Sequence, residues 1–75
     1  MKTMDIRLST IQDVQNFVNI VNRYDLDIDL SSGRYIVDAK SIMGIFSLDL
    51  LQPIKLTAHA EDTDALFADL AAFRA

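Results

Sequence analysis

The stretch Asp38–Leu48 decides the fold, and it reads DAKSIMGIFSL. It joins the end of an expected strand to the start of an expected helix. Ser41 stands just before an apolar run, where its hydroxyl accepts a hydrogen bond from a free backbone N–H group of the next turn. The spacing of Ile42, Ile45 and Leu48 predicts that these three side chains face the core. The sequence therefore predicts a central helix capped by Ser41.

Two apolar residues of this helix are left over once its core face is assigned. Met43 and Phe46 are three residues apart, so they share a different face. A short helix can bury such residues, but the amphipathic pattern favours their exposure, and Met suits adaptable protein contacts. We therefore expect a surface that binds protein partners, with Ile11 and Leu50 at its border. The expected partner-binding residues are Lys40, Met43, Phe46, Leu50 and Ile11.

The residues before this stretch predict a strand followed by a helix. Apolar and polar residues alternate over 4–9, which is typical of a strand with one buried face. Ser9 and Thr10 each have a polar acceptor three residues later, so either of them can cap the helix that follows. The apolar stripe of that helix consists of Ile11, Val14, Phe17, Val18, Val21 and Tyr24.

The remaining residues predict a hairpin, a fourth strand and a last helix. Strict alternation over 25–30, a turn at 31–33 and the apolar run 34–37 predict the hairpin. After a break at Gln52-Pro53, alternation over 54–60 predicts the fourth strand. Asp62, Thr63 and Asp64 then begin a helix with the apolar stripe Leu66, Phe67, Leu70 and Phe73.

The order of elements is thus β-α-β-β-α-β-α, which belongs to the α+β class. We expect one four-stranded antiparallel sheet with three helices on one face, an open-faced β-sandwich whose other face is exposed to solvent. Residues 1–75 are expected to form a single domain. From the pattern alone, a ferredoxin-like α+β domain is the alternative.

Composition excludes several classes of function. A net charge of −4 with only seven basic residues disfavours a nucleic-acid surface and an acidic membrane surface. The absence of cysteine excludes disulfides, a thiolate nucleophile and a cysteine-based zinc site. No apolar run is long enough for a signal peptide or a bilayer span, so we expect a cytoplasmic protein.

The segment Lys40–Leu48 resembles the regulatory-serine segment of the HPr family, the small phosphocarriers of the bacterial sugar phosphotransferase system. The resemblance extends to Arg23-Tyr24-Asp25, to the alternating run Asp25–Leu30, to the turn at Ser32-Gly33 and to the helix start at Asp64-Ala65-Leu66. These segments occur in the order and spacing of the family and cover nearly the whole chain. The resemblance implies the open-faced sandwich.

One segment departs from the family pattern. Where the family has its phospho-accepting histidine, in a His-x-Arg-Pro segment after the first strand, this chain has Thr10-Ile11-Gln12-Asp13. A threonine phosphate is a stable ester, whereas a phosphocarrier needs the labile P–N bond of a histidine. Thr10, Gln12 and Asp13 therefore form a degenerate carrier site, as in family members of the Crh type, and we expect no phosphotransfer.

The resemblance implies that Ser41 is the serine phosphorylated by a dedicated kinase. It also implies protein partners: that serine kinase, a transcription regulator or a phosphotransferase-system component. We therefore expect a non-catalytic regulatory or adaptor protein that is switched by phosphate on Ser41 and uses no cofactor. The alternatives are a small-molecule-binding α+β module and a structural or dimerising domain.

No residue set suggests an enzyme or a metal site. His59 is the only histidine and has no nucleophile or second ligand near it in sequence, so we expect a surface histidine. Asp25, Asp27 and Asp29 resemble the start of a calcium loop, but Leu30 stands where that loop requires glycine. We interpret these carboxylates as the solvated face of a strand.

Overall fold

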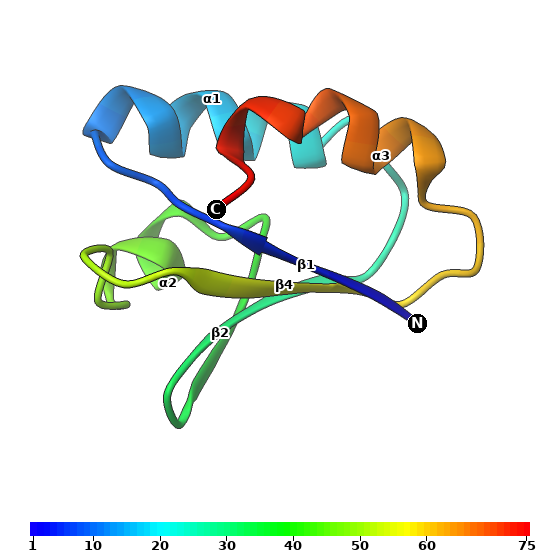
Figure 1. Ribbon diagram of the computed structural model, residues 1–75. Helices are drawn as coiled ribbons and strands as arrows, with labels where there is room; N and C mark the ends of the chain where they lie inside the picture. Colours follow the sequence, from blue (N-terminus) through cyan, green and yellow to red (C-terminus); the bar gives the residue numbers. More distant parts are fainter.

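The computed structural model describes all 75 residues, which form four strands, three α-helices and one 3-10 turn. The strands pair antiparallel in the order β1-β4-β2-β3, and Figure 1 shows α1 and α3 running above β1 and β4. This confirms the expected four-stranded antiparallel sheet with three helices. The bounds are β1 Lys2–Ile6, α1 Ile11–Val21, β2 Ile28–Ser32, β3 Tyr35–Asp38, α2 Ile42–Phe46, β4 Ile54–Ala58, α3 Asp64–Asp69 and η1 Ala71–Phe73.

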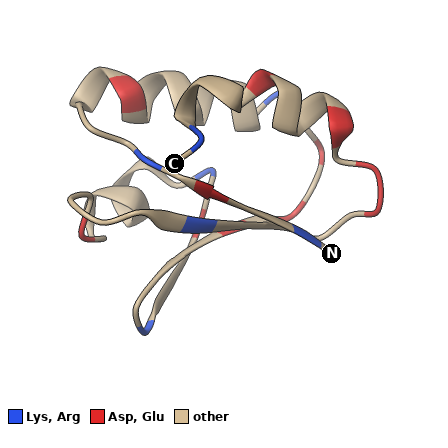
Figure 2. Cartoon of the chain, in the orientation of Figure 1, with Lys and Arg blue, Asp and Glu red and all other residues tan.

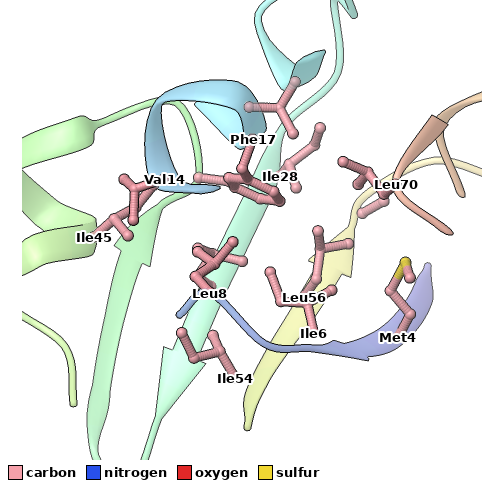
Figure 3. Packing of buried hydrophobic residues seen from close by; sticks show 14 of the residues in the cluster. Met4, Ile6, Leu8, Val14, Phe17, Ile28, Ile45, Ile54, Leu56 and Leu70 are labelled. Atoms are coloured by element: carbon pink, nitrogen blue, oxygen red, sulfur yellow. The ribbon is translucent and has the colours of Figure 1, made fainter. Parts of the chain in front are cut away.

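One hydrophobic core lies between the sheet and its helices (Figure 3). Phe17 of α1 is completely buried, and its ring meets that of Phe73 edge to face at 5.9 Å between centroids. On α2, Ile45 is completely buried and lies beside Val14 of α1. The core therefore joins all the helices to one face of the sheet. The opposite face carries Thr3, Asp5 and Lys55, which are exposed.

All four strands differ in extent from the sequence-based expectation. The first strand spans Lys2–Ile6 rather than 4–9, and the third spans Tyr35–Asp38 rather than 34–37. The second strand spans Ile28–Ser32 rather than 25–30, and the fourth ends at Ala58 rather than at residue 60. Ala58 pairs with Lys2 on one side and Ile28 on the other, which are the terminal residues of their strands. The alternation in the sequence continues beyond Ala58. The strands on either side of β4 end there, so β4 ends with them.

The hairpin turn is also displaced from residues 31–33. Ser32 pairs with Tyr35, so the loop consists of Gly33 and Arg34 alone. Gly33 has φ +59°, a backbone conformation that side chains with a Cβ rarely adopt, and glycine at the first position of a two-residue loop is typical of a type II′ turn. Ser32 therefore belongs to β2 and not to the turn.

The first residue of α1 is exposed, which agrees with its expected place at the border of the partner-binding surface but not with burial along the apolar stripe. Val14, Phe17 and Val21 are buried as the apolar stripe predicts, but Ile11 is 67% exposed. Ile11 is the first helical residue, and no element of the fold covers its side chain. No helix of the chain is long and apolar enough to cross a membrane.

Candidate functional site

Ser41 caps α2 as the sequence predicts. Its backbone is extended (φ −99°, ψ 105°), and its Oγ accepts a hydrogen bond from the N–H group of Gly44 at 3.1 Å. The serine is exposed, and the first turn of α2 contains no acidic residue. The hydroxyl is therefore accessible from solvent at the uncharged N-terminal end of a five-residue helix.

Gly44 allows α2 to approach the sheet closely. A Cβ at this position would lie 3.2 Å from the Oγ of Ser41 and 3.2 Å from the Cβ of Val37 on β3. Both contacts are tighter than ordinary van der Waals packing. The glycine thus maintains both the cap geometry and the contact between α2 and β3.

The two apolar residues left over on α2 are exposed. Met43 is 78% exposed and Phe46 is 43% exposed, and the pair is called the α2 patch below. They lie one turn apart, so their side chains are neighbours on the helix surface. The expectation of exposure is confirmed for both residues.

Leu50 and Lys40 are less accessible to a protein partner than the sequence suggested. Leu50 is half buried and packs against the core, whereas Leu51, which the sequence analysis did not single out, is 83% exposed. Lys40 is also half buried, and its ammonium group donates a hydrogen bond to the carbonyl oxygen of Tyr24 at 2.7 Å. That bond holds Lys40 to the end of α1. The Leu50-Leu51 pair could have indicated that only one leucine packs inward, but not which one.

Thr10, rather than Ser9, is the N-cap of α1. Its Oγ1 accepts a hydrogen bond from the N–H group of Asp13 at 3.0 Å, and the Asp13 carboxylate accepts one from the N–H group of Ser9 at 3.0 Å. Gln12 donates from its side-chain amide to the side-chain oxygen of Asn16 at 2.9 Å. The polar groups expected at the degenerate carrier site are therefore engaged in local hydrogen bonds that stabilise the helix start.

His59 follows β4 and forms a side-chain hydrogen bond that the sequence did not predict. Its Nε2 lies 2.7 Å from a carboxylate oxygen of Asp29. The pair lines a shallow hollow of about 590 Å³, together with Asp27, Asp38 and Lys40. Thirty residues separate the two partners, so no local pattern could have found them. No group of three or more His, Asp or Glu residues is arranged to hold a metal ion.

Tyr24 connects three segments just after α1. Its hydroxyl donates a hydrogen bond to the Asp69 carboxylate, and its carbonyl oxygen accepts the bond from Lys40. The hydrogen bond to Asp69 raises the pKa of Tyr24 above its ordinary value of 10.0. Burial and the negative charge of Asp69 act in the same direction, and the nearby Arg23 opposes them. The residue therefore stabilises the packing of α1 against α3.

The charges of the chain form no basic surface. Figure 2 shows the basic positions scattered over strands and loops, with acidic positions on α1, α3, β1 and the loops between elements. No lysine or arginine side chain forms an ion pair with a carboxylate. This distribution offers no cluster of cations for a polyanion.

One family model and several solved structures are similar to this chain. The family model described as "PTS HPr component phosphorylation site" matches residues 12–75. The match begins two residues after Thr10. No curated protein sequence matches the chain.

Three solved structures resemble this one closely. HPr-C-His from Thermoanaerobacter tengcongensis has a TM-score of 0.80 at 28% identity, over 96% of this chain and 89% of that one. The phosphocarrier protein HPr from Bacillus anthracis has a TM-score of 0.73 at 30% identity, over 99% and 94%. Crh of Bacillus subtilis, described as a dimer with a swapped domain, has a TM-score of 0.68 at 32% identity, over 89% and 79%. The chain therefore belongs to the HPr family of the bacterial phosphotransferase system.

Proposed function

We propose that this single-domain protein is a non-catalytic regulatory adaptor of the HPr family that acts in the cytoplasm. Its partners are other proteins, and it binds them through the surface of α2 around Ser41, Met43 and Phe46. Phosphate on Ser41 switches this binding. The protein does not carry phosphate between enzymes.

The observation that carries the proposal is the exposure of the α2 patch beside an accessible cap hydroxyl. Met43 follows Ser41 by two residues, and Phe46 lies one turn further along. Ile11 is also exposed and belongs to α1, the helix against which α2 packs. Exposed methionine and aromatic side chains suit a contact with another protein.

Phosphate suits Ser41 for electrostatic reasons. A phosphoserine adds about −1.5 to −2 charges at pH 7, together with acceptor oxygens for free backbone N–H groups. The first turn of α2 has no carboxylate to repel it. The new charge would lie next to Met43 and change which partner surfaces fit the α2 patch. Lys40 does not neutralise this charge in the proposal, because its ammonium group is bound to Tyr24.

The degenerate carrier site supports the second half of the proposal. Thr10 offers a hydroxyl in place of an imidazole, and that hydroxyl already accepts a hydrogen bond. The Asp13 carboxylate lies at the same helix start, where it repels an incoming phosphoryl group. Both features oppose phosphate transfer at this position.

The first experiment incubates the protein with ATP and a serine kinase that phosphorylates HPr proteins. We expect one phosphate by mass spectrometry in the wild-type protein and none in Ser41→Ala. The Met43→Ser variant should have a higher KM for the kinase, since the α2 patch lies beside the target. The matched control Tyr35→Ser changes a residue that is 70% exposed on β3 and should leave KM unchanged. No incorporation into the wild type would remove the regulatory proposal.

The second experiment tests the carrier function directly. Wild-type protein is incubated with phosphoenolpyruvate and the first enzyme of the phosphotransferase system. We expect no acid-labile, alkali-stable phosphate, and a known HPr in the same assay serves as the positive control. If such phosphate forms and disappears in His59→Ala, the chain carries phosphate on His59 and the proposal is wrong.

The small-molecule alternative has weaker support. The hollow beside His59 is lined mostly by polar residues, whereas binding sites for small molecules are mostly apolar with a few placed polar groups. Three of its lining side chains are carboxylates, Asp27, Asp29 and Asp38. The α2 patch therefore remains the better-supported site.

A further inference from the structure

The two edge strands of the sheet, β1 and β3, differ in how far the rest of the chain covers them. At the β1 edge, the C-terminal residues return alongside the strand: Arg7 donates its N–H group to the carbonyl of Phe73 at 2.7 Å, and Ala75 donates to the carbonyl of Asp5 at 3.0 Å. Figure 1 shows the C-terminus lying close to β1. At the other edge, β3 pairs with β2 alone. One edge is therefore partly covered by the chain itself, and the other is open.

The backbone of β3 has hydrogen-bonding groups that face away from the sheet. Beyond the end of β3, Ala39 donates its N–H group to the carbonyl of Ile28 at 2.9 Å. Since an antiparallel ladder alternates, the groups of Val37 and Tyr35 also face β2, and those of Ile36 face outward. A row of unpaired N–H and C=O groups is a template for another strand.

The side chains of this open edge are unusually apolar. Tyr35 is 70% exposed and Ile36 is 71% exposed, although both lie in a strand. β3 contains no lysine or proline, and its register with β2 is not interrupted by a bulge; all three are common ways to protect an edge strand. Arg34 at one end of β3 has no ion pair within the chain. Asp38 stands at the other end, where Oδ1 accepts a bond from the N–H group of Lys40.

We propose that β3 pairs antiparallel with β3 of a second copy of this chain, with the Ile36 residues of the two copies directly opposite each other. The outward groups of Ile36 then form the central hydrogen-bonded pair. In this register, Arg34 of one copy lies opposite Asp38 of the other at both ends. Tyr35 lies opposite Val37, an aromatic and β-branched pair of the kind that stabilises sheets. The two sheets join into one through an isologous contact.

Other pairings of the same strands are less favourable. A shift by two residues in one direction puts Ile36 opposite Asp38, and in the other direction opposite Arg34. A parallel arrangement in register places Arg34 against Arg34 and Asp38 against Asp38, which costs free energy by like-charge repulsion. Unlike charges thus favour the proposed register and orientation. This inference is independent of the proposed role of Ser41.

The test measures the mass of the full-length protein by sedimentation as its concentration rises. We expect the wild-type mass to rise from 8.4 kDa toward twice that value. Arg34→Asp and Asp38→Arg should each remain monomeric, because each places like charges at both ends of the contact. An equimolar mixture of these two variants restores unlike charges at both ends and should dimerise. Arg23→Asp is the matched control, since it makes the same charge change outside β3 and should behave like wild type.

Folding of each variant is checked by circular dichroism, and Ile36→Lys provides a second disruption at the centre of the contact. A wild-type protein that stays monomeric at every concentration would overturn the proposal. So would a dimer that persists unchanged in Arg34→Asp and Ile36→Lys, which would point to exchange of a whole segment as in the swapped Crh dimer. Failure of the equimolar mixture of folded variants to associate would exclude the proposed register.

Discussion

Helices α1 and α2 begin in the same way but present different surroundings. Thr10 and Ser41 both have extended backbones, and each hydroxyl accepts a hydrogen bond from the N–H group three residues later, at 3.0 and 3.1 Å. At α1 the first turn contains the carboxylate of Asp13, which also binds the N–H group of Ser9. At α2 the first turn contains no charge: Gly44 stands at the position equivalent to Asp13, and Met43 before it is exposed.

The two helices thus share a capping hydroxyl but differ in the charge of their first turn. A carboxylate at a helix start satisfies free N–H groups and the positive end of the helix dipole, so it stabilises the helix and leaves no place for a second anion. The start of α2 lacks that internal anion. It is therefore the helix start at which a phosphate has the more favourable electrostatic environment.

The largest expected difference concerns how each helix is anchored. Helix α1 has three buried residues, whereas α2 has only Ile45. Ile45→Ala should lower the free energy of unfolding by about 3 kcal/mol, because it leaves a cavity against Val14. Urea denaturation measures the loss, and hydrogen exchange at Gly44 should become faster. Met43→Ala, on the exposed face of the same helix, is the control and should change stability by about 0.5 kcal/mol or less. Equal losses in the two variants would contradict this account of α2.

The two caps themselves should contribute similarly. Thr10→Ala and Ser41→Ala should each cost about 1 kcal/mol of stability, because each removes the acceptor for one N–H group. Thr10→Asp and Ser41→Asp keep an acceptor and should stay close to wild type in thermal denaturation. A much larger loss for one alanine variant would show that its hydroxyl has a role beyond capping.

A smaller effect should come from the charge at the start of α1. Asp13→Asn keeps an acceptor for the N–H group of Ser9 but removes the negative charge, so we expect a loss of about 0.5 kcal/mol. The loss should decrease at high salt concentration. Asp25→Asn makes the same change at an exposed position outside the helices and serves as the control. A loss that does not respond to salt would show that the charge is not the cause.

The smallest effect is confined to alkaline pH and concerns Tyr24, the residue that links the end of α1 to Lys40. Because folding raises its pKa, the stabilisation is fully present below the ordinary value of 10.0 and is lost as pH rises through the raised value. Wild-type stability should therefore fall more steeply than that of Tyr24→Phe when urea denaturation is compared between neutral and strongly alkaline pH. Tyr35→Phe is the control, since the Tyr35 hydroxyl forms no hydrogen bond in the chain. Equal alkaline losses in the wild type and Tyr24→Phe would exclude this contribution.

Local signals in the sequence located the elements well. The hydroxyl caps, the alternation of the strands and the apolar stripes all depend on residues within one or two turns of each other. The start of the central helix, its cap and its exposed pair are therefore confirmed, although α2 ends at Phe46 and does not reach Leu48. The ends of the second and fourth strands were not predicted correctly, since a strand ends where its partners end, and those partners lie far away in the sequence.

The candidate site was only partly predictable for the same reason. The sequence indicated that Met43 and Phe46 do not belong to the core face of the short amphipathic helix. It did not show that Leu50 packs inward while Leu51 faces solvent, or that Lys40 is held by Tyr24. The pairing of His59 with Asp29 also depends on how two strands meet.

By itself, the sequence determined the order of the elements, the capped helix starts and the resemblance to one family, because hydrogen bonds and periodicity of this kind are encoded within short segments. Only the tertiary structure decided which side chains stay in solvent and which sheet edge remains open. Burial and strand pairing depend on contacts between distant segments, such as the C-terminal residues that cover β1 and leave β3 uncovered.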